Sequence, residues 1–590
     1  MMELDHSVKK ICFSAVQLLI SYITVRGFQF RLTGQGLIIA DTRSFEWLLL
    51  FLFILWTLSR SAAEKDRRLK GYGMVLSVII AANYSIGLSF EKMENLIWMA
   101  AGGGNFIHYC NFSFSCFILC YCFVFLCFQK LRDLKWKDRK AFSYKRVLLF
   151  WAILLVFYIP WYQYCYPGVL TYDSGSQIRD ALSVDTISDH HPALPTLMIR
   201  GILLPVQRFT GSVQTGVGIC TFLQMLAVTF VFAFVCEKIF ERVHFHPLFV
   251  LMFLWYAIYP VNNIYSVTMW KDVLFSVIFL IFLLCMDSAS DHEEVFFSSR
   301  SKCLFFFLSL LLLPLFRHNG IFITAVMTIY LPFRFRNSRR KVMLLCLGVL
   351  LLFGCWKGLI LPALNAKPIP SQEYLSTPLQ QIARVFANHH EELSEEVKET
   401  AAPFFDLPEF WTVYLPILSD EIRSHLNSSY YEENRDIFFT LWKQLGKQYP
   451  LEYLEAFLHN HYGYSFPEAN YWISSYGVIT GKHIADVETA PIRKDPIVDR
   501  IYNWYAYHHD KDYPLVPLLF KPGACWWLWL FCGAYSLYTN RKKFILFLTG
   551  VFLWLTIQFS AVFCEYRYVY GLFIGLPLLI VSVFTTQDTR

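Results

Sequence analysis

Residues 342–362, VMLLCLGVLLLFGCWKGLILP, decide the fold class, because this stretch contains a single charged side chain, Lys357. A helix needs about 20 predominantly apolar residues to cross the hydrocarbon core of a bilayer. The stretch therefore predicts a membrane-spanning helix. The basic run at residues 334–341 just before it predicts that this helix begins on the cytoplasmic side.

The whole chain has the composition of a membrane protein. Of its 590 residues, 56% are apolar and 16% are charged, whereas soluble domains are about 45–50% apolar and about 25% charged. This difference excludes a soluble protein. The net charge of +7 does not indicate an acidic partner, because Lys and Arg lie in short runs between apolar segments. Most of the 16 Cys lie inside apolar runs and are expected to be small buried hydrophobes.

Apolar segments recur along the chain, and about fourteen of them are expected to span the membrane. They predict an all-α fold, a polytopic transmembrane helix bundle with a mainly helical extracytoplasmic domain. The segments lie near residues 11–25, 45–59, 73–90, 106–128, 146–163, 213–236, 247–260, 268–287, 303–316, 319–334, 342–362, 523–539, 544–562 and 568–584.

The positions of Lys and Arg predict the topology, since these residues accumulate in short cytoplasmic connections. The runs at 60–70, 130–146, 238–242, 334–341 and 541–543 all fall on one side under this helix count. Both termini are then cytoplasmic, and residues 1–25, which lack a convincing cleavage site, are expected to remain as a first helix. The expected regions are an N-terminal four-helix region (1–145), a membrane core (146–362) with an outer loop (164–214), an extracytoplasmic helical domain (363–522) and C-terminal spans (523–590).

The outer loop contains the densest group of chemically capable residues, in the stretch YPGVLTYDSGSQIRDALSVDTISDHHPALP (166–195). Turn-forming residues at 167–168 and 192 frame this group, which argues against an ordinary solvated loop. A carboxylate beside histidines suits either a general base or a divalent cation such as Mg²⁺ or Mn²⁺. Both alternatives stay open, with Asp173, Asp189 and His191 as the ligands in the second. The candidate residues of the loop are Asp173, Gln177, Asp189, His190 and His191.

Three further polar clusters are expected at the outer ends of helices. Ionisable groups cost about 2.5–3.5 kcal/mol at the centre of a membrane-spanning helix and less toward the interface, so such groups are snorkelling, internally paired or functional. Cations at this depth suit the phosphate or pyrophosphate of a lipid head group. No pattern typical of nucleotide binding accompanies them. The clusters are Trp270, Lys271 and Asp272, then Arg317, His318 and Asn319, and finally Glu565 and Arg567.

The ordered combination of these motifs resembles the GT-C superfamily of multispanning membrane glycosyltransferases. It is most similar to a set of bacterial membrane proteins with a PG…YDS..Q…DxHP loop, a WKD helix start, an FRHNG turn, a PLQQIARV stretch and an EYRY segment. The corresponding residues here are 167–192, 270–272, 316–320, 378–385 and 565–568. The likeness covers roughly residues 150–580 and leaves out the first four expected helices.

This resemblance implies a role for each matching residue. Asp173 would act as the base on the acceptor or orient it, and Asp189 with His190 or His191 would be a second acid, a hydrogen-bond partner or a metal ligand. Lys271, Arg317 and Arg567 would neutralise the phosphate of the departing lipid. The residues expected to contact substrate are Gln177, His191, Asp272, Asn319, Gln381, Arg384 and Glu565.

These expectations describe a glycosyltransferase of the bacterial cell membrane. It would move a sugar from a polyprenyl-phosphate carrier to an extracytoplasmic acceptor, namely a cell-wall or surface glycopolymer, a glycolipid or a protein, with inversion and without a nucleic-acid partner. Two alternatives stay open: a polysaccharide polymerase or ligase that uses lipid-linked oligosaccharide, and a lipid flippase or transporter. Charges at the outer edge rather than near mid-membrane favour the enzyme over the transporter.

Overall fold

The computed structural model describes most of the chain. The residues outside the description are 1, 34–35, 40–44, 97–102, 135, 137–138, 184–186, 245, 472–486, 489, 507–508, 514, 559–561 and 586–590. The described part is mostly helical, and a short antiparallel hairpin of β1 (Phe30–Thr33) and β2 (Gly36–Ile39) is its one sheet. The predicted all-α class is therefore confirmed.

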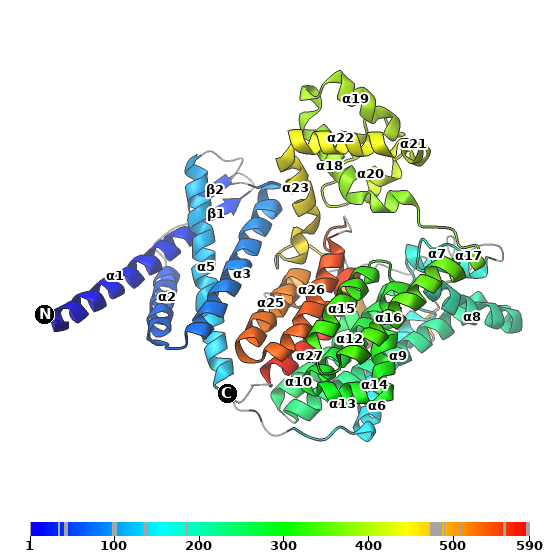
Figure 1. The fold of residues 1–590 in the computed structure, drawn as a ribbon, viewed down its shortest axis with the longest axis horizontal. Helices are drawn as coiled ribbons and strands as arrows, with labels where there is room; N and C mark the ends of the chain where they lie inside the picture. Colours follow the sequence, from blue (N-terminus) through cyan, green and yellow to red (C-terminus); the bar gives the residue numbers. More distant parts are fainter. Residues whose placement is uncertain are drawn as a thin grey trace.

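The N-terminal region is a group of long helices beside the rest of the bundle (Figure 1). Asp66 begins one of these helices, because its side chain accepts hydrogen bonds from the backbone N–H groups of Arg68 and Leu69. The helices are α1 (Met2–Phe28), α2 (Phe45–Ala63), α3 (Arg67–Met93) and α5 (Gly103–Arg132).

The central bundle follows in sequence and contains a π-helical turn near its end. Its helices are α6 (Tyr144–Cys165), α7 (Tyr172–Leu182), α8 (Ala193–Thr210), α9 (Val213–Val243), α10 (Pro247–Ile258), α11 (Pro260–Ser266), α12 (Lys271–Asp291), α13 (Glu293–Ser298), α14 (Arg300–Phe316), α15 (Gly320–Arg334), α16 (Arg339–Cys355), the π-helix η1 (Trp356–Ile360) and α17 (Leu361–Ala363).

The next helices form a lobe that rises from one end of the bundle (Figure 1), and the chain then returns to the bundle. The lobe has its own hydrophobic core, made by residues between 375 and 453. Its main helices are α18 (Ser376–His389), α19 (Glu395–Ala401), α20 (Asp420–Ser424), α21 (Ser428–Glu433), α22 (Arg435–Gln448) and α23 (Pro450–His461). The returning helices are α24 (Pro496–Ala506), α25 (Pro522–Thr539), α26 (Phe544–Ile557) and α27 (Tyr566–Phe584).

The apolar helices are compatible with a multi-pass membrane protein, but the predicted count of about fourteen spans is not confirmed. Among the described residues, eight helices are long and apolar enough to cross a membrane, or nine if α10 and α11, bent by 42°, form one span. Several predicted spans form helices shorter than the usual length of about 20 residues: α14 has 17 residues, α15 has 15 and α26 has 14.

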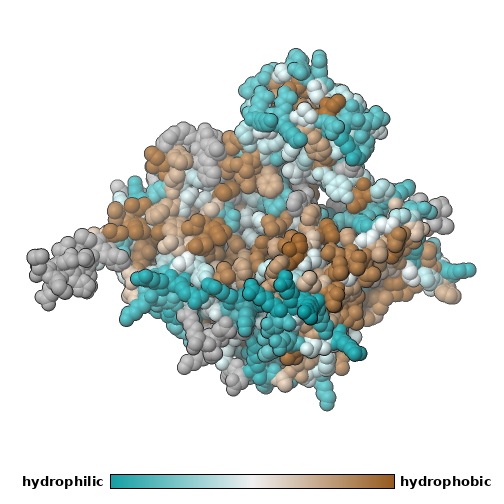
Figure 2. All heavy atoms as spheres, in the orientation of Figure 1, coloured by the Kyte–Doolittle hydropathy of each residue, from teal (hydrophilic) through white to brown (hydrophobic). Residues whose placement is uncertain are grey.

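Burial separates the central helices from the peripheral ones. The apolar windows of α12 and α27 are 78% buried, whereas that of the span Arg339–Ala363, formed by α16, η1 and α17, is 17% buried. Figure 2 shows hydrophobic side chains across the middle of the molecule and hydrophilic ones on the α18–α23 lobe and along the lower edge. The exposed apolar surface therefore forms the band that lipid would cover, while α12 and α27 lie inside the bundle.

Candidate active site

A short parallel bridge aligns the beginnings of α7 and α12. The Val169 N–H donates to the Val267 carbonyl (2.9 Å), and the Met269 N–H donates to the Val169 carbonyl (3.0 Å). Gly168 permits this approach, because a Cβ there would lie 3.0 Å from the Val267 carbonyl oxygen and 2.5 Å from Cγ2 of Thr221 on α9. The loop is therefore fixed against the bundle just before Asp173.

The first turn of α7 is also tied to α12. Thr171 and Ser174 form a capping box, and the Ser174 hydroxyl donates to the Met269 carbonyl at 2.7 Å. The indole N–H of Trp270 donates to the Thr171 hydroxyl. These bonds place Asp173, the second residue of α7, beside Lys271, the first residue of α12.

Asp173 contacts two cations through one oxygen atom. Its Oδ2 lies 3.3 Å from Nζ of Lys271 and 2.6 Å from Nη1 of Arg567, which is in the first turn of α27. Burial alone would raise the pKa of Asp173, but the charges of Lys271 and Arg567 outweigh it and hold the pKa below its usual value. Asp173 is therefore an anion in the free protein.

His191 lies on the other side of Lys271, with its Nδ1 3.1 Å from Nζ. An ammonium group can only donate, so Nδ1 accepts this bond and His191 is neutral. Burial, followed by the charge of Lys271, lowers the pKa of His191 to about 3. The neighbouring His190 ring has its centroid 4.7 Å from that of His191.

Asp272, the residue after Lys271, forms a second ion pair with Arg317. Nη1 of Arg317 lies 3.2 Å from Oδ1 of Asp272, whose side chain is 3% exposed. Glu565 lies 3.6 Å from Nε of Arg567. Together these residues form the Asp173 cluster, which consists of Asp173, His191, Lys271, Asp272, Arg317, Glu565 and Arg567.

Aromatic rings support the two guanidinium groups of the cluster. The guanidinium of Arg317 lies 4.1 Å from the centroid of the Tyr568 ring, and that of Arg567 lies 5.1 Å from the same ring. Arg567 also lies 5.0 Å from the ring of Trp270. Ring faces attract cations within about 6 Å, so Tyr568 stabilises both charges while leaving their N–H groups free to bind oxygen. The motif residues Trp270 and Tyr568 were not among the predicted site residues.

Asp189 lies outside the Asp173 cluster and contacts a different cation. Its Oδ2 lies 2.7 Å from Nζ of Lys357 in η1, and its Oδ1 accepts the backbone N–H of Ala193 at the start of α8. Its carbonyl accepts a 2.8 Å bond from Nε2 of His318. Both carboxylate oxygens are therefore used within the fold. Lys357 is the one charged residue in the apolar run 342–362, and this isolation is the feature of the sequence that could have indicated a special role for it.

Two further predicted residues, Gln177 and Asn319, lie on α7 and at the start of α15. Gln177 is one turn after Asp173 on α7 and is 1% exposed, and its Nε2 makes no hydrogen bond to any described residue. A buried donor of this kind is available to a ligand. Asn319, at the start of α15, donates a long 3.4 Å bond to the carbonyl of Thr556.

Gln381 and Arg384 make contacts inside the α18–α23 lobe. Arg384 pairs with Glu452 (2.7 Å) and Glu455 (2.5 Å) on α23. Gln381 donates to the Tyr453 carbonyl and accepts the indole N–H of Trp442. These bonds join the lobe helices to one another, and a contact of either residue with substrate stays a prediction.

The predicted metal ligands do not fit a divalent cation. Asp173 and His191 both direct a donor atom at Lys271, and Asp189 directs one at Lys357. A cation among them would face two ammonium groups. Within the described ranges, no group of three or more His, Cys, Asp or Glu residues could hold a metal ion.

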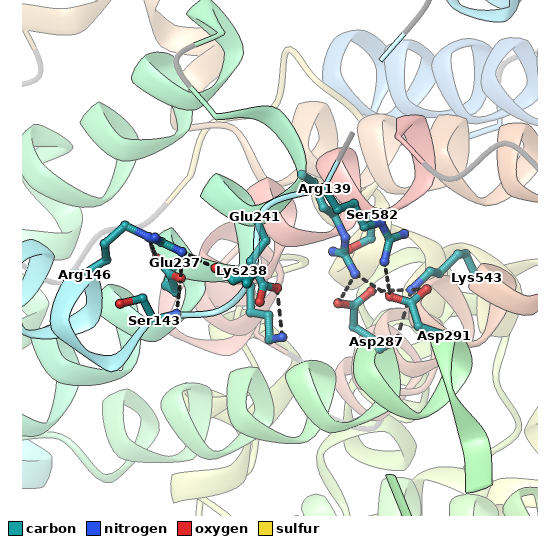
Figure 3. Close-up of polar contacts among 12 residues, drawn as sticks. Arg139, Ser143, Arg146, Glu237, Lys238, Glu241, Asp287, Asp291, Lys543 and Ser582 are labelled. Atoms are coloured by element: carbon teal, nitrogen blue, oxygen red, sulfur yellow. Dashed lines mark hydrogen bonds and ion pairs between the residues drawn. The ribbon is translucent and has the colours of Figure 1, made fainter. Parts of the chain in front are cut away.

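A second buried network lies at the opposite end of α12 (Figure 3). Asp287 and Asp291 each pair with Arg242 and Lys543, at distances of 2.7–2.9 Å. Arg139 pairs with Asp291 at 3.0 Å. The three cations come from the basic runs that predicted the cytoplasmic side, and they meet at one end of the bundle. The Asp287 network consists of Arg139, Arg242, Asp287, Asp291, Lys543 and Ser582, which accepts from Arg242.

A protein-family model matches residues 183–589, and it describes DUF6020, a family of unknown function. The match covers more than half of the chain. The chain belongs to the DUF6020 family. The DUF6020 match includes Asp189, His191, Lys271, Arg317 and Arg567, but it begins after Asp173 and after the N-terminal helices. No curated protein and no solved structure matches the chain.

Proposed function

We propose that this chain is a membrane glycosyltransferase of the GT-C type, located in the bacterial cell membrane with both termini in the cytoplasm. It moves a sugar from a polyprenyl-phosphate carrier to an acceptor on the extracytoplasmic side, which is a cell-wall or surface glycopolymer, a glycolipid or a protein. The proposal is supported by the sequence resemblance and by the residues that meet around Asp173.

The observation that carries the proposal is one carboxylate between two cations at the ends of buried helices. Asp173 is 20% exposed, while Lys271 and Arg567 are 12% and 13% exposed. A base and a pair of phosphate-binding cations are the groups that transfer from a phosphate leaving group requires. All three lie at the end of the bundle opposite the Asp287 network.

The proposed reaction is a single displacement at the anomeric carbon. Asp173 takes the proton of the acceptor hydroxyl as its oxygen forms a bond to the anomeric carbon. The bond between that carbon and the phosphate oxygen breaks, and the phosphate keeps the electron pair. Lys271 and Arg567 stabilise the developing negative charge on the phosphate. Arg317, which is paired with Asp272, adds a third positive charge nearby.

The remaining residues have supporting roles. Gln177 offers its unpaired Nε2 to a sugar or phosphate oxygen. Neutral His191 orients Lys271 through the 3.1 Å bond. Glu565 orients Arg567, and Asn319 lies near the turn that carries Arg317.

The test is transfer from a panel of polyprenyl-phosphate sugars to cell-envelope fractions by the purified protein. We expect wild type to consume one donor and Asp173→Asn to lose about 10²–10⁴-fold in rate, as is typical for loss of a general base. The matched control is Asp436→Asn, which makes the same chemical change on the exposed first turn of α22.

Two outcomes would reject the proposal. Full activity of Asp173→Asn would remove the assigned base. Transport of a labelled lipid across liposomes without consumption of any lipid-linked sugar would favour a flippase instead.

A further inference from the structure

The cations assigned to the phosphate are already neutralised in the free protein. Oδ2 of Asp173 lies 3.3 Å from Lys271 and 2.6 Å from Arg567, so a single atom occupies the point where their donors converge. A phosphate oxygen that binds both cations would have to take the same position. The two anions therefore compete for one site.

The charges of the cluster leave no unpaired cation for a ligand. The cations are Lys271, Arg317 and Arg567, and the carboxylates are Asp173, Asp272 and Glu565. An added phosphate would lie within a few Å of Asp173 and be repelled by it. Binding thus requires one carboxylate to move away.

Exposure identifies the carboxylate that moves. The side chains of Asp272 and Glu565 are 3% and 7% exposed, and Asp272 is paired with Arg317. Asp173 is 20% exposed and belongs to α7, a helix of only 11 residues. Its carboxylate can rotate toward solvent at the lowest desolvation cost.

We propose that Lys271 and Arg567 form an anion-binding site in which the Asp173 carboxylate occupies the ligand position until a phosphate group replaces it. The displaced carboxylate is then free of both cations and accepts a proton more readily. Resting on the proposed function, this step would make Asp173 an effective base only after the donor has bound. The protein would not activate an acceptor in the absence of donor.

The test measures binding of three probes to the full-length protein in detergent: a polyprenyl monophosphate, the uncharged polyprenol of the same length, and inorganic phosphate. We expect Asp173→Asn to bind the polyprenyl monophosphate about tenfold or more tightly than wild type, because the competing anion is gone. The polyprenol should bind both proteins equally. Asp436→Asn should match wild type with every probe.

The arms of the experiment separate the sources of the phosphate. Tighter binding of polyprenyl monophosphate alone assigns the site to a lipid head group, whereas an equal gain for inorganic phosphate assigns it to the free ion. Equal or weaker binding of both phosphates by Asp173→Asn overturns the proposal. The binding measurement involves no transfer, so it can succeed where the proposed glycosyltransferase activity fails.

A second measurement uses wild type and covers the case in which Asp173→Asn does not fold. Carbodiimides react with protonated carboxyl groups, and peptide mass spectrometry reports the modification of Asp173. We expect polyprenyl monophosphate to speed this labelling, since the displaced carboxyl is more easily protonated. Unchanged or slower labelling would contradict displacement.

Discussion

Lys357 and Asp189 form a 2.7 Å ion pair that joins the π-helical turn η1 to the loop before α8. π-Helical turns are rare and occur frequently at functional sites. The pair holds the segment that also contains His191, and His191 contacts Lys271 of the Asp173 cluster. The position of the cluster thus depends on a residue outside it.

Replacing Lys357 by Met should lower activity more than stability. Asp189 is 7% exposed and would be left without its cation, but Lys357 itself is 37% exposed, so we expect a loss of only about 1–2 kcal/mol. The displaced loop should reduce kcat. Thermal unfolding and transfer rates would measure the two effects. Lys357→Arg is the control and should restore most of the rate; equal losses for Arg and Met would contradict the positioning role.

Tyr568 should contribute to phosphate binding through its ring alone. Its ring lies 4.1 Å from Arg317 and 5.1 Å from Arg567. We expect Tyr568→Leu to weaken binding of polyprenyl monophosphate by about 1–2 kcal/mol, as for a desolvated cation–π contact. Tyr568→Phe keeps the ring and should bind as wild type does. A large loss in the Phe variant would instead assign the effect to the hydroxyl group.

His191 should make the protein less stable as the pH falls. Its pKa is lowered from 6.5 to about 3 in the fold, so the unfolded chain binds an extra proton between these values. The contribution of neutral His191 is present above about pH 6.5 and decreases by up to about 1.4 kcal/mol per pH unit toward pH 3. Unfolding of wild type and His191→Gln across this range would measure it. Identical pH slopes would show that His191 is not buried as described.

The Asp287 network should be essential for stability and dispensable for ligand recognition. Asp287 is fully buried, with Lys543 and Arg242 at 2.7 Å. Its replacement by Asn should destabilise the protein by about 3–5 kcal/mol, because two buried cations are then left with the single carboxylate of Asp291. Removing the exposed pair of Arg435 and Glu432 by Glu432→Gln should leave stability almost unchanged. A loss of phosphate-lipid affinity in the folded Asp287 variant would contradict the expectation that the network is dispensable for ligand recognition.

Sequence patterns predicted that Asp173, Lys271 and Arg567 lie on one side of the membrane, and in the structure they are in contact although 98 and 394 positions separate Asp173 from the two cations. Helix periodicity places charged motifs at helix ends, and the positive-inside rule places those ends on one side. The rule carries no information on which helix ends touch. That information came from the bridge between Val169 and Thr268 and from the burial of α12 and α27.

The rest of the site could not be read from local patterns. Asp189 was predicted to act with the histidines, but its carboxylate is used by Lys357, a residue in an apolar run. The sequence around Asp287 and Asp291 did not predict the Asp287 network, because the partners of these acids come from three distant basic runs. The predicted count of about fourteen spans is not confirmed, because apolar composition alone does not determine where a helix ends.

The burial of α12 and the charges at both of its ends restrict how this protein can move. A shift of α12 by a single residue along its axis, about 1.5 Å, would strain the ion pair of Asp272 with Arg317 at one end and that of Asp287 with Lys543 at the other. Both ion pairs therefore oppose a shift of α12 along its axis. Any opening that admits a lipid has to come from elements that lie outside this fixed helix, such as α7, α8 and the exposed α16.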